Sequence, residues 1–325
     1  MQTNTVTLRG LTATNNSNIP FETAIFALYQ STLYDGSDKE NYLSVSDLIA
    51  PVRKTVLKLK YKIKPEMDVS NMLAAAKGTS HHSDMELALQ AYNDEQTNDD
   101  AKYIQEVRSA KEFGKWTVAG KFDMVTGKDE NGKRTLKDLK HVSGYSVQKL
   151  NTEKETMEHG LTIEEAMESR PTYTKFQLQL SIYCDLNQDL DLNPYADILF
   201  MLSSKVGFGP SPTDFAVRFP VLPAEEVEEF IKRRIALIEE QLALDELTIF
   251  CSPVERGTTQ AEYKVKRMNK AGNYATVAGS KFNNRSDVDA FLRNKGRAGD
   301  IIDETPASHK LCNYCPHYGT TCDQI

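Results

Sequence analysis

The segments WTVAGKFDMV (116–125) and TLKDLKHV (135–142) decide the fold. Each alternates apolar and polar residues over a short run, which is typical of a β-strand, and Asn131-Gly132 between them is typical of a hairpin turn. Because side chains point alternately to the two faces of a strand, Asp138 and Lys140 should lie on the same face. The pattern predicts neighbouring strands that bring polar groups together.

Asp123 and Asp138 suggest the chemistry of these strands. Two carboxylates can converge on a hard divalent cation, which prefers oxygen ligands, polarises a phosphate and lowers the pKa of bound water. Leu139 should point into the core, which leaves its carbonyl oxygen as a further ligand. Lys140 would orient the attacking water or stabilise negative charge in the transition state. Gly120 should let the backbone come close at the start of its strand.

A candidate nitrogen ligand precedes the strands, in GTSHHSDME at 78–86. On a helix, His82 and Glu86 would share a face because they are four residues apart. A neutral imidazole could then bind the same metal. His81 is the alternative ligand, and spacing alone does not separate the two histidines.

A further helix follows the strands. In QLSIY at 179–183, Gln179 and Tyr183 are also four residues apart and would present an amide and a phenol on one face. Both groups can hydrogen-bond to a phosphate or to a metal-bound carboxylate. Packing of the aromatic residue in the core would explain the same pattern.

The remaining spacing predicts an α/β protein whose sheet is sandwiched by helices. Helices are expected at 20–34, 70–77, 80–92, 172–185 and 224–247, with a break at Gly78-Thr79, and strands within 103–142 and at 196–204 and 215–222. We expect two parts, a core at 1–248 and a tail at 249–325.

Composition limits the class of protein. The chain has 325 residues and 40% hydrophobic content, enough for one sizeable core with a smaller module. No apolar run approaches the roughly 20 residues that span a bilayer, and the polar N-terminus lacks a secretory pattern, so we expect a cytoplasmic protein. The net charge of −7 argues against a nucleic-acid partner, but 53–64 and 263–297 are basic. Local basic faces neutralise phosphates, although these segments are equally expected as solvated surface.

The motifs, in their order, resemble the PD-(D/E)XK nuclease superfamily, and more narrowly its RecB-type exonuclease branch. They read GTSHH at 78–82, GKFD at 120–123, DLK at 138–140 and QLSIY at 179–183, and YLSVSDLIAPVRK at 42–54 resembles the opening segment of that branch. The resemblance implies a restriction-endonuclease-like core with a mixed central sheet flanked by helices. It also implies a nuclease dependent on Mg²⁺ or Mn²⁺.

The resemblance assigns roles to individual residues. It implies metal ligation by His82, Asp123, Asp138 and Leu139, catalysis by Lys140, and organisation of the site by Gln179 and Tyr183. The substrate would be linear DNA, cut by an exonuclease in recombination, replication or repair. A helicase, or a recombinase or single-strand annealing protein, is left open as a partner.

Three cysteines lie in the last fourteen residues of the chain. Cys312, Cys315 and Cys322 resemble the C-terminal cluster of iron–sulfur members of this branch, in which four thiolates hold a [4Fe–4S] cluster. The usual fourth cysteine lies in the opening segment, where this chain has none, and Cys251 is the expected replacement. That layout is similar to phage-type members, which would place the protein in a host cytoplasm.

Structural Zn²⁺ is the alternative to a cluster, with His309 or His317 replacing one thiolate. In either case the metal would clip the tail to the core, and Tyr263, Tyr274 and Phe282 of the basic insert could stack on a strand. Cys184 is expected to be a buried, small apolar residue. Two other functions remain open: a non-catalytic DNA-binding or assembly protein on the same fold, and a zinc-ribbon interaction protein.

Overall fold

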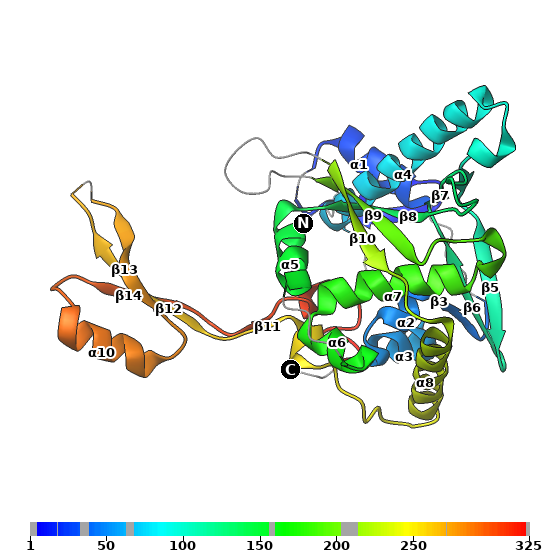
Figure 1. Ribbon diagram of the computed structural model, residues 1–325. Helices are drawn as coiled ribbons and strands as arrows, with labels where there is room; N and C mark the ends of the chain where they lie inside the picture. Colours follow the sequence, from blue (N-terminus) through cyan, green and yellow to red (C-terminus); the bar gives the residue numbers. More distant parts are fainter. Residues whose placement is uncertain are drawn as a thin grey trace. The chain divides into compact units, whose positions relative to one another are not determined.

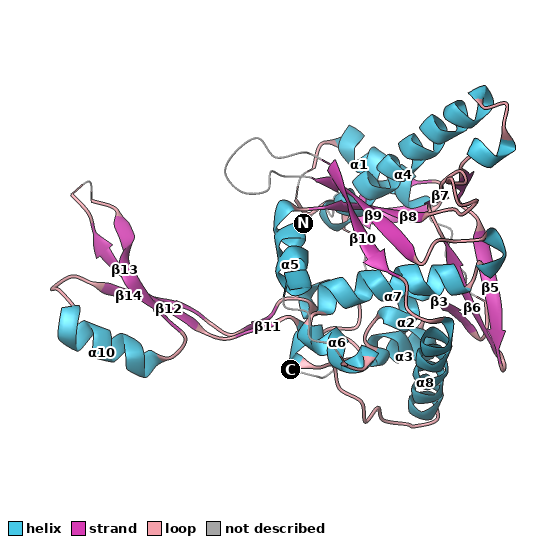
Figure 2. Ribbon diagram, viewed as in Figure 1, coloured by secondary structure: helices cyan, strands magenta, loops and turns pink. Residues whose placement is uncertain are grey.

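The computed structural model describes residues 5–17, 19–32, 39–62, 68–155, 160–202, 214–270 and 272–322. The protein is mixed α/β (Figures 1 and 2) and divides into two compact units, Met1–Thr248 and Ile249–Ile325. Within the described ranges, no helix is both long enough and apolar enough to cross a membrane.

The first unit contains a five-stranded mixed sheet in the order β10-β9-β8-β7-β4. Its strands are β4 (Ile104–Gln105), β7 (Met124–Val125), β8 (Leu136–Val142), β9 (Tyr195–Leu202) and β10 (Asp214–Pro220). Strands β8 and β9 are parallel, with Asp138 paired to Ile198, while the other neighbours are antiparallel. Parallel β8 and β9 are joined by a helical crossover, as parallel pairing requires.

A second sheet has the order β3-β6-β5, formed by β3 (Tyr42–Ser44), β5 (Arg108–Phe113) and β6 (Trp116–Lys121). The strands expected within 103–142 are therefore divided between two sheets. Asp123 lies between β6 and β7, where the chain passes from one sheet to the other. Gly120 lies near the end of β6 rather than at its start, which corrects the expectation from sequence.

Helices accompany these sheets: α2 (Val45–Ile49), α3 (Val52–Tyr61), α5 (Gly144–Glu155), α6 (Ile163–Ser169), α7 (Pro171–Asp185) and α8 (Ala224–Leu242). Helix α2 begins with a capping box in which the Ser44 side chain and Asp47 satisfy each other's backbone N–H groups. The predicted helix at 172–185 is confirmed, whereas α8 ends at Leu242, before residue 247. Helices α5 and α6 were not predicted.

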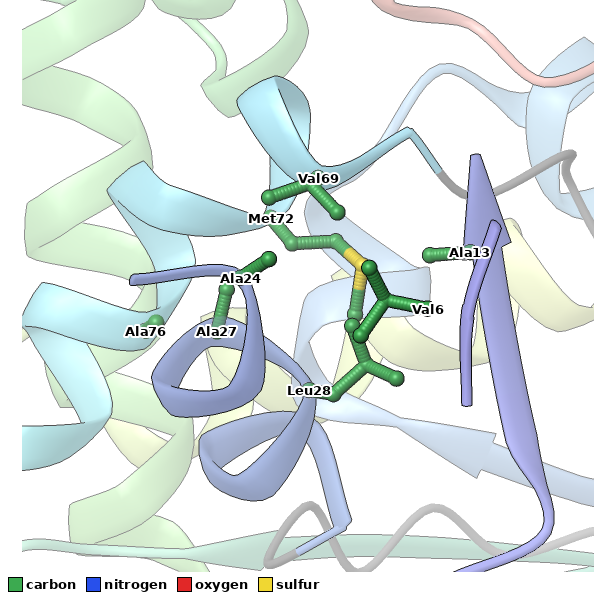
Figure 3. Packing of buried hydrophobic residues seen from close by; sticks show 8 residues of the cluster. All are labelled: Val6, Ala13, Ala24, Ala27, Leu28, Val69, Met72 and Ala76. Atoms are coloured by element: carbon green, nitrogen blue, oxygen red, sulfur yellow. The ribbon is translucent and has the colours of Figure 1, made fainter. Parts of the chain in front are cut away.

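Helices α1 (Phe21–Thr32) and α4 (Val69–Glu95) pack together beside a hairpin of β1 (Thr5–Leu8) and β2 (Leu11–Thr14). Figure 3 shows their shared cluster, composed of Val6, Ala13, Ala24, Ala27, Leu28, Val69, Met72 and Ala76. The predicted break at Gly78-Thr79 is wrong, because α4 continues through both residues. Packing of its first turns on α1 outweighs the modest helix propensity lost at one glycine.

The basic segment at 53–64 serves internal contacts where it is described. Arg53 is buried, Lys58 pairs with Asp47 at 2.8 Å, and the Lys60 ammonium donates to the carbonyls of Leu244 and Asp245. Arg53, Lys58 and Lys60 therefore stabilise the first unit, whereas Lys54 and Lys62 are exposed. Residues 63 and 64 lie outside the described part.

The second unit contains a three-stranded sheet, β13-β12-β14, with one longer helix. Its elements are α9 (Pro253–Arg256), β11 (Thr258–Thr259), β12 (Glu262–Met268), β13 (Tyr274–Phe282), α10 (Arg285–Lys295), β14 (Ile301–Thr305) and β15 (Ser308–His309). Val265 of β12 and Val288 of α10 are fully buried. Phe282 packs against Phe291 with ring centroids 5.5 Å apart, so it belongs to this small core.

Candidate metal centre

Three potential metal ligands converge where α4 meets the sheet. The ligand atoms of His82, Glu106 and Asp123 all lie within 4.8 Å of one another. Among the described residues, no other three His, Cys, Asp or Glu side chains come together in this way. The Nδ1 atom of His82 is 3.1 Å from Oδ1 of Asp123. Their hydrogen bond is the main cause that holds the pKa of His82 above its ordinary value. His82, rather than His81, therefore faces the centre.

Glu106 was not singled out from the sequence. It follows the two-residue strand β4, and its backbone has a φ of 51°, which few non-glycine residues adopt. Its N–H donates to the carbonyl of Asp123 at 3.1 Å, and its carboxylate pairs with Lys121. No motif marks this position, because the chain brings Glu106 beside Asp123 only through the pairing of β4 with β7.

Asp138, which is buried, and Lys140, which is partly exposed, form an ion pair on β8, with 2.6 Å between Oδ2 and Nζ. The Asp138 side chain is 3% exposed, and burial raises the pKa of this carboxyl to about 6. Burial lowers the pKa of Lys140, but the charge and hydrogen bond of Asp138, together with the charges of Asp123 and Tyr183, raise it by more, so the net shift is upward. The Oδ2 atom has no well-directed hydrogen bond despite the ion pair.

Helix α7 holds the other oxygen of Asp138. The amide of Gln179 donates to Oδ1 of Asp138 and to the hydroxyl of Tyr183, both at 3.2 Å. Burial raises the pKa of Tyr183 to about 12, so the phenol stays protonated at neutral pH. Tyr183 reaches this place because Gly120 has no side chain: an added Cβ would lie 2.4 Å from the Tyr183 ring.

Leu139 links the two carboxylates. Its side chain is 1% exposed, as expected, and its N–H donates to Oδ2 of Asp123 at 2.6 Å. A small cavity is lined by His82, Glu86, Glu106, Asp123 and Leu139, among other residues. Ligation by the Leu139 carbonyl stays a prediction. All the motif residues chosen from sequence are thus brought to one region, from α4, α7 and the strands between them.

These donors fit a hard divalent cation. Two carboxylates and one imidazole lie within 4.8 Å of one another, and Mg²⁺ and Mn²⁺ favour such oxygen-rich sets. Asp138 is not a member of this group, because its two oxygens contact Gln179 and Lys140. The separation of 3.1 Å between His82 and Asp123 is close to one edge of an octahedron with bonds of about 2.1 Å, which is about 3.0 Å long. The cluster lacks thiols, so it is unlike a structural zinc site.

The C-terminal cysteines lie in the second unit. Burial raises the pKa of Cys312, and the neighbouring Cys315 and Cys322 raise it further. Backbone pairing of Leu311 with Arg256, at 3.0 Å, brings this turn beside α9. Cys251 lies just before that helix, whose N-cap is Ser252.

The environment of these thiols fits an anionic metal–thiolate group in part. The Nε atom of Arg256 is buried without a hydrogen-bond partner, and its charge acts on Cys312. Among the described residues, however, no three cysteine sulfurs lie within 4.8 Å of one another. Four-cysteine ligation therefore stays a prediction.

Three other residues considered from the sequence are His309 and His317 of the second unit and Cys184 of the first. His309 Nδ1 contacts Thr258 at 2.9 Å, and His317 is 1% exposed with Nδ1 3.1 Å from Thr321. Cys184 is buried in the first unit, as expected, and burial raises its pKa to about 12. That thiol is consequently poorly suited to bind metal.

Comparison with known proteins adds little. No family model matches the sequence, and no curated protein matches it. Among solved structures, the chain is similar to one titled "Crystal structure of SSO0001", at 17% identity over 66% of this chain and 84% of that chain. The TM-score of 0.39 is too low to support an argument about fold or function.

Proposed function

We propose that this protein is a metal-dependent deoxyribonuclease with a PD-(D/E)XK core, which hydrolyses phosphodiester bonds of linear DNA as an exonuclease. One observation carries the proposal. His82, Glu106 and Asp123 converge beside the ion pair of Asp138 and Lys140, although these residues come from four separate segments. Convergence of this kind is what a divalent-metal phosphodiesterase requires.

The chain's own residues would divide the work. His82, Glu106, Asp123 and Asp138 would hold Mg²⁺ or Mn²⁺, which supplies Lewis acidity toward the phosphate and a more acidic water. Lys140 places a positive charge where negative charge develops on the phosphate. Gln179 fixes Asp138 through its amide, and Leu139 fixes Asp123 through its N–H. Rigid support of this kind keeps the ligands pre-organised.

The cysteine tail would be a separate structural element. Cys251, Cys312, Cys315 and Cys322 would hold a [4Fe–4S] cluster, or Zn²⁺ as the alternative. The buried Arg256 guanidinium favours an anionic group at this place. The cluster or the Zn²⁺ ion would contribute to the folding of the tail and not to phosphodiester hydrolysis.

End-labelled linear DNA and closed circular DNA of the same sequence test the proposal, each with Mg²⁺ and with Mn²⁺. The wild-type protein should degrade the linear DNA and leave the circle intact. Asp138→Asn should lose at least about 10²-fold in rate, because a ligand with the same shape but no charge replaces the carboxylate.

Asp189→Asn is the matched control, because it makes the same charge change at a residue outside the proposed ligand set. Asp189 is exposed on the turn after α7. It should keep wild-type activity. Binding of DNA without metal-dependent cleavage, unchanged by Asp138→Asn, would instead support the non-catalytic DNA-binding alternative.

A further inference from the structure

Basic side chains form a cluster of their own next to the candidate metal centre. His82 of α4 points toward Asp123, while the preceding residue, His81, lies against His141 of β8. The two imidazole rings have centroids 4.9 Å apart and an interplanar angle of 38°. Because side chains alternate along a strand, His141 shares the face of β8 that carries Leu139, and Leu139 lines the small cavity with His82 and Asp123.

Lys77 completes this cluster. It is four residues before His81 on α4, so both side chains lie on one helix face. The contact between the two rings and the helical spacing of Lys77 and His81 bring the three side chains to one place on the surface.

Gly78 lies on the same part of α4 and has no packing explanation. Glycine in a helix interior is destabilising relative to alanine, yet a Cβ added at Gly78 would meet no atom within 4 Å. Open space over a helical glycine lets a ligand approach the backbone closely. The position is next to Lys77 and one turn before His81.

The centre itself offers little attraction for an anionic strand. Its acids are Glu106, Asp123 and Asp138, and its nearest lysines are engaged, Lys121 with Glu106 and Lys140 with Asp138. A DNA strand carries one negative charge per nucleotide, and phosphate contacts fix its register on a protein. Donors for a neighbouring phosphate must therefore come from outside this ligand set.

We propose that Lys77, His81 and His141, with the open backbone at Gly78, form a subsite for a phosphate of the substrate strand next to the one that is cut. This inference rests on the proposed nuclease function. The imidazole N–H groups and the ammonium donate to the phosphate oxygens, and the strand is thereby positioned over the metal centre. The three side chains are positioning residues, since they contact the substrate away from the reacting phosphate.

The test separates binding from cleavage. Affinity for an end-labelled linear duplex, and for its single strand, is measured in Ca²⁺ over a range of salt, and KM and kcat are measured in Mn²⁺. The double variant His81→Ala/His141→Ala should raise Kd and KM about tenfold while kcat changes less than about twofold. Lys77→Ala should reduce the slope of log Kd against log salt by about 0.9 on the duplex.

Gly78→Ala provides a readout that a purely structural role would not give. Alanine should raise the thermal midpoint, because it favours the helix, and should weaken DNA binding, because its methyl group blocks the approach of the strand. Lys154→Ala is the control for charge, since Lys154 is exposed near the end of α5 and belongs to neither α4 nor β8. It should leave Kd, KM and the salt slope unchanged.

If the wild type cleaves DNA normally but the histidine and Gly78 variants keep its Kd and KM, the inference is overturned. The proposed nuclease function would still stand. Cleavage is also measured with added Zn²⁺. If the histidine variant keeps the wild-type Kd and KM and differs only in being less inhibited by Zn²⁺, the pair binds a metal and the inference is overturned. A wild-type protein that binds DNA through these residues but never cleaves it would support the subsite while refuting the nuclease function.

Discussion

Glu106 has a backbone conformation that its own side chain does not favour. A φ of 51° in a residue other than glycine costs on the order of 1–3 kcal/mol, and such strain concentrates at functional sites. Here it accompanies a carboxylate placed within 4.8 Å of the ligand atoms of His82 and Asp123. Strain at this position is consistent with a ligand role for Glu106.

Glu106→Gln should therefore weaken Mn²⁺ binding by about 10–100-fold, because the amide keeps the shape of the side chain but removes its charge. The concentration of Mn²⁺ needed for half-maximal DNA cleavage measures this effect. Glu130→Gln, an exposed change in the β7–β8 loop, is the control and should leave that concentration unchanged. An unaltered Mn²⁺ requirement in Glu106→Gln would remove Glu106 from the ligand set.

Gly120→Ala should destabilise the first unit by about 1–3 kcal/mol through overpacking. The added Cβ would lie 2.4 Å from the Tyr183 ring and 2.7 Å from Val45, so α7 or α2 must move. Urea unfolding followed by the fluorescence of Trp116, the single tryptophan, measures the change. Equal stability of Gly120→Ala and wild type would show that Tyr183 is not held against β6 as described.

Single residues could be predicted where a motif carried them. Strand alternation and helical spacing pointed to Asp138, Lys140, Gln179 and Tyr183, which do lie together. The choice between His81 and His82 needed coordinates, because it depends on the rotation of α4 relative to the sheet. Glu106 could not be predicted, since its role depends on one short strand pairing.

At the scale of elements, α4 shows why a local signal can fail. One glycine costs a helix about 1 kcal/mol, while burial of Val69, Met72 and Ala76 against α1 stabilises the same helix by more. The continuous helix fixes the position of His82 relative to that packed end. The cluster in Figure 3 thus holds in place the first turns of α4, which precede His82 of the candidate metal centre.

Leu28→Ala should accordingly cost about 2–5 kcal/mol in the free energy of unfolding, because Leu28 is fully buried in that cluster. Leu87→Ala on α4 is the matched control, with a side chain that is 70% exposed, and should change stability by less than about 0.5 kcal/mol. Urea unfolding followed by circular dichroism compares them. Similar losses in both variants would contradict the packing of α1 on α4.

The strand hairpin was predicted, but its division between two sheets was not. Period-two alternation reports which residues are buried and carries no information about which strand pairs with which. β6 pairs with β3 and β5, whereas β7 and β8 join β9, and this separation leaves Asp123 at the junction. The sequence therefore indicated which residues gather in this region better than how its strands pair.

For the molecule as a whole, charge is unevenly divided. The second unit has eleven lysine and arginine residues against eight acidic ones, a net charge of +3, although the chain carries −7. The first unit therefore carries −10 and includes the acidic candidate metal centre. Electrostatic attraction for a polyanion is concentrated in the smaller unit, where Tyr274 is 43% exposed.

Metal analysis of protein purified without oxygen tests the cysteine tail. We expect iron and sulfide with absorbance near 400 nm, lost in Cys312→Ser and kept in Cys184→Ala, because only the former removes a predicted ligand. Zinc in place of iron would favour the alternative metal. Retention of the metal in Cys312→Ser would contradict the predicted ligand set.

The most direct test of the central claim is titration of the full chain with Mn²⁺, following the signal of free Mn²⁺ by electron paramagnetic resonance. The wild-type protein should remove Mn²⁺ from solution with a saturable stoichiometry, and Asp123→Asn should lose most of this binding. Equal Mn²⁺ binding by the two proteins, or none by the wild type, would contradict a metal centre at His82, Glu106, Asp123 and Asp138.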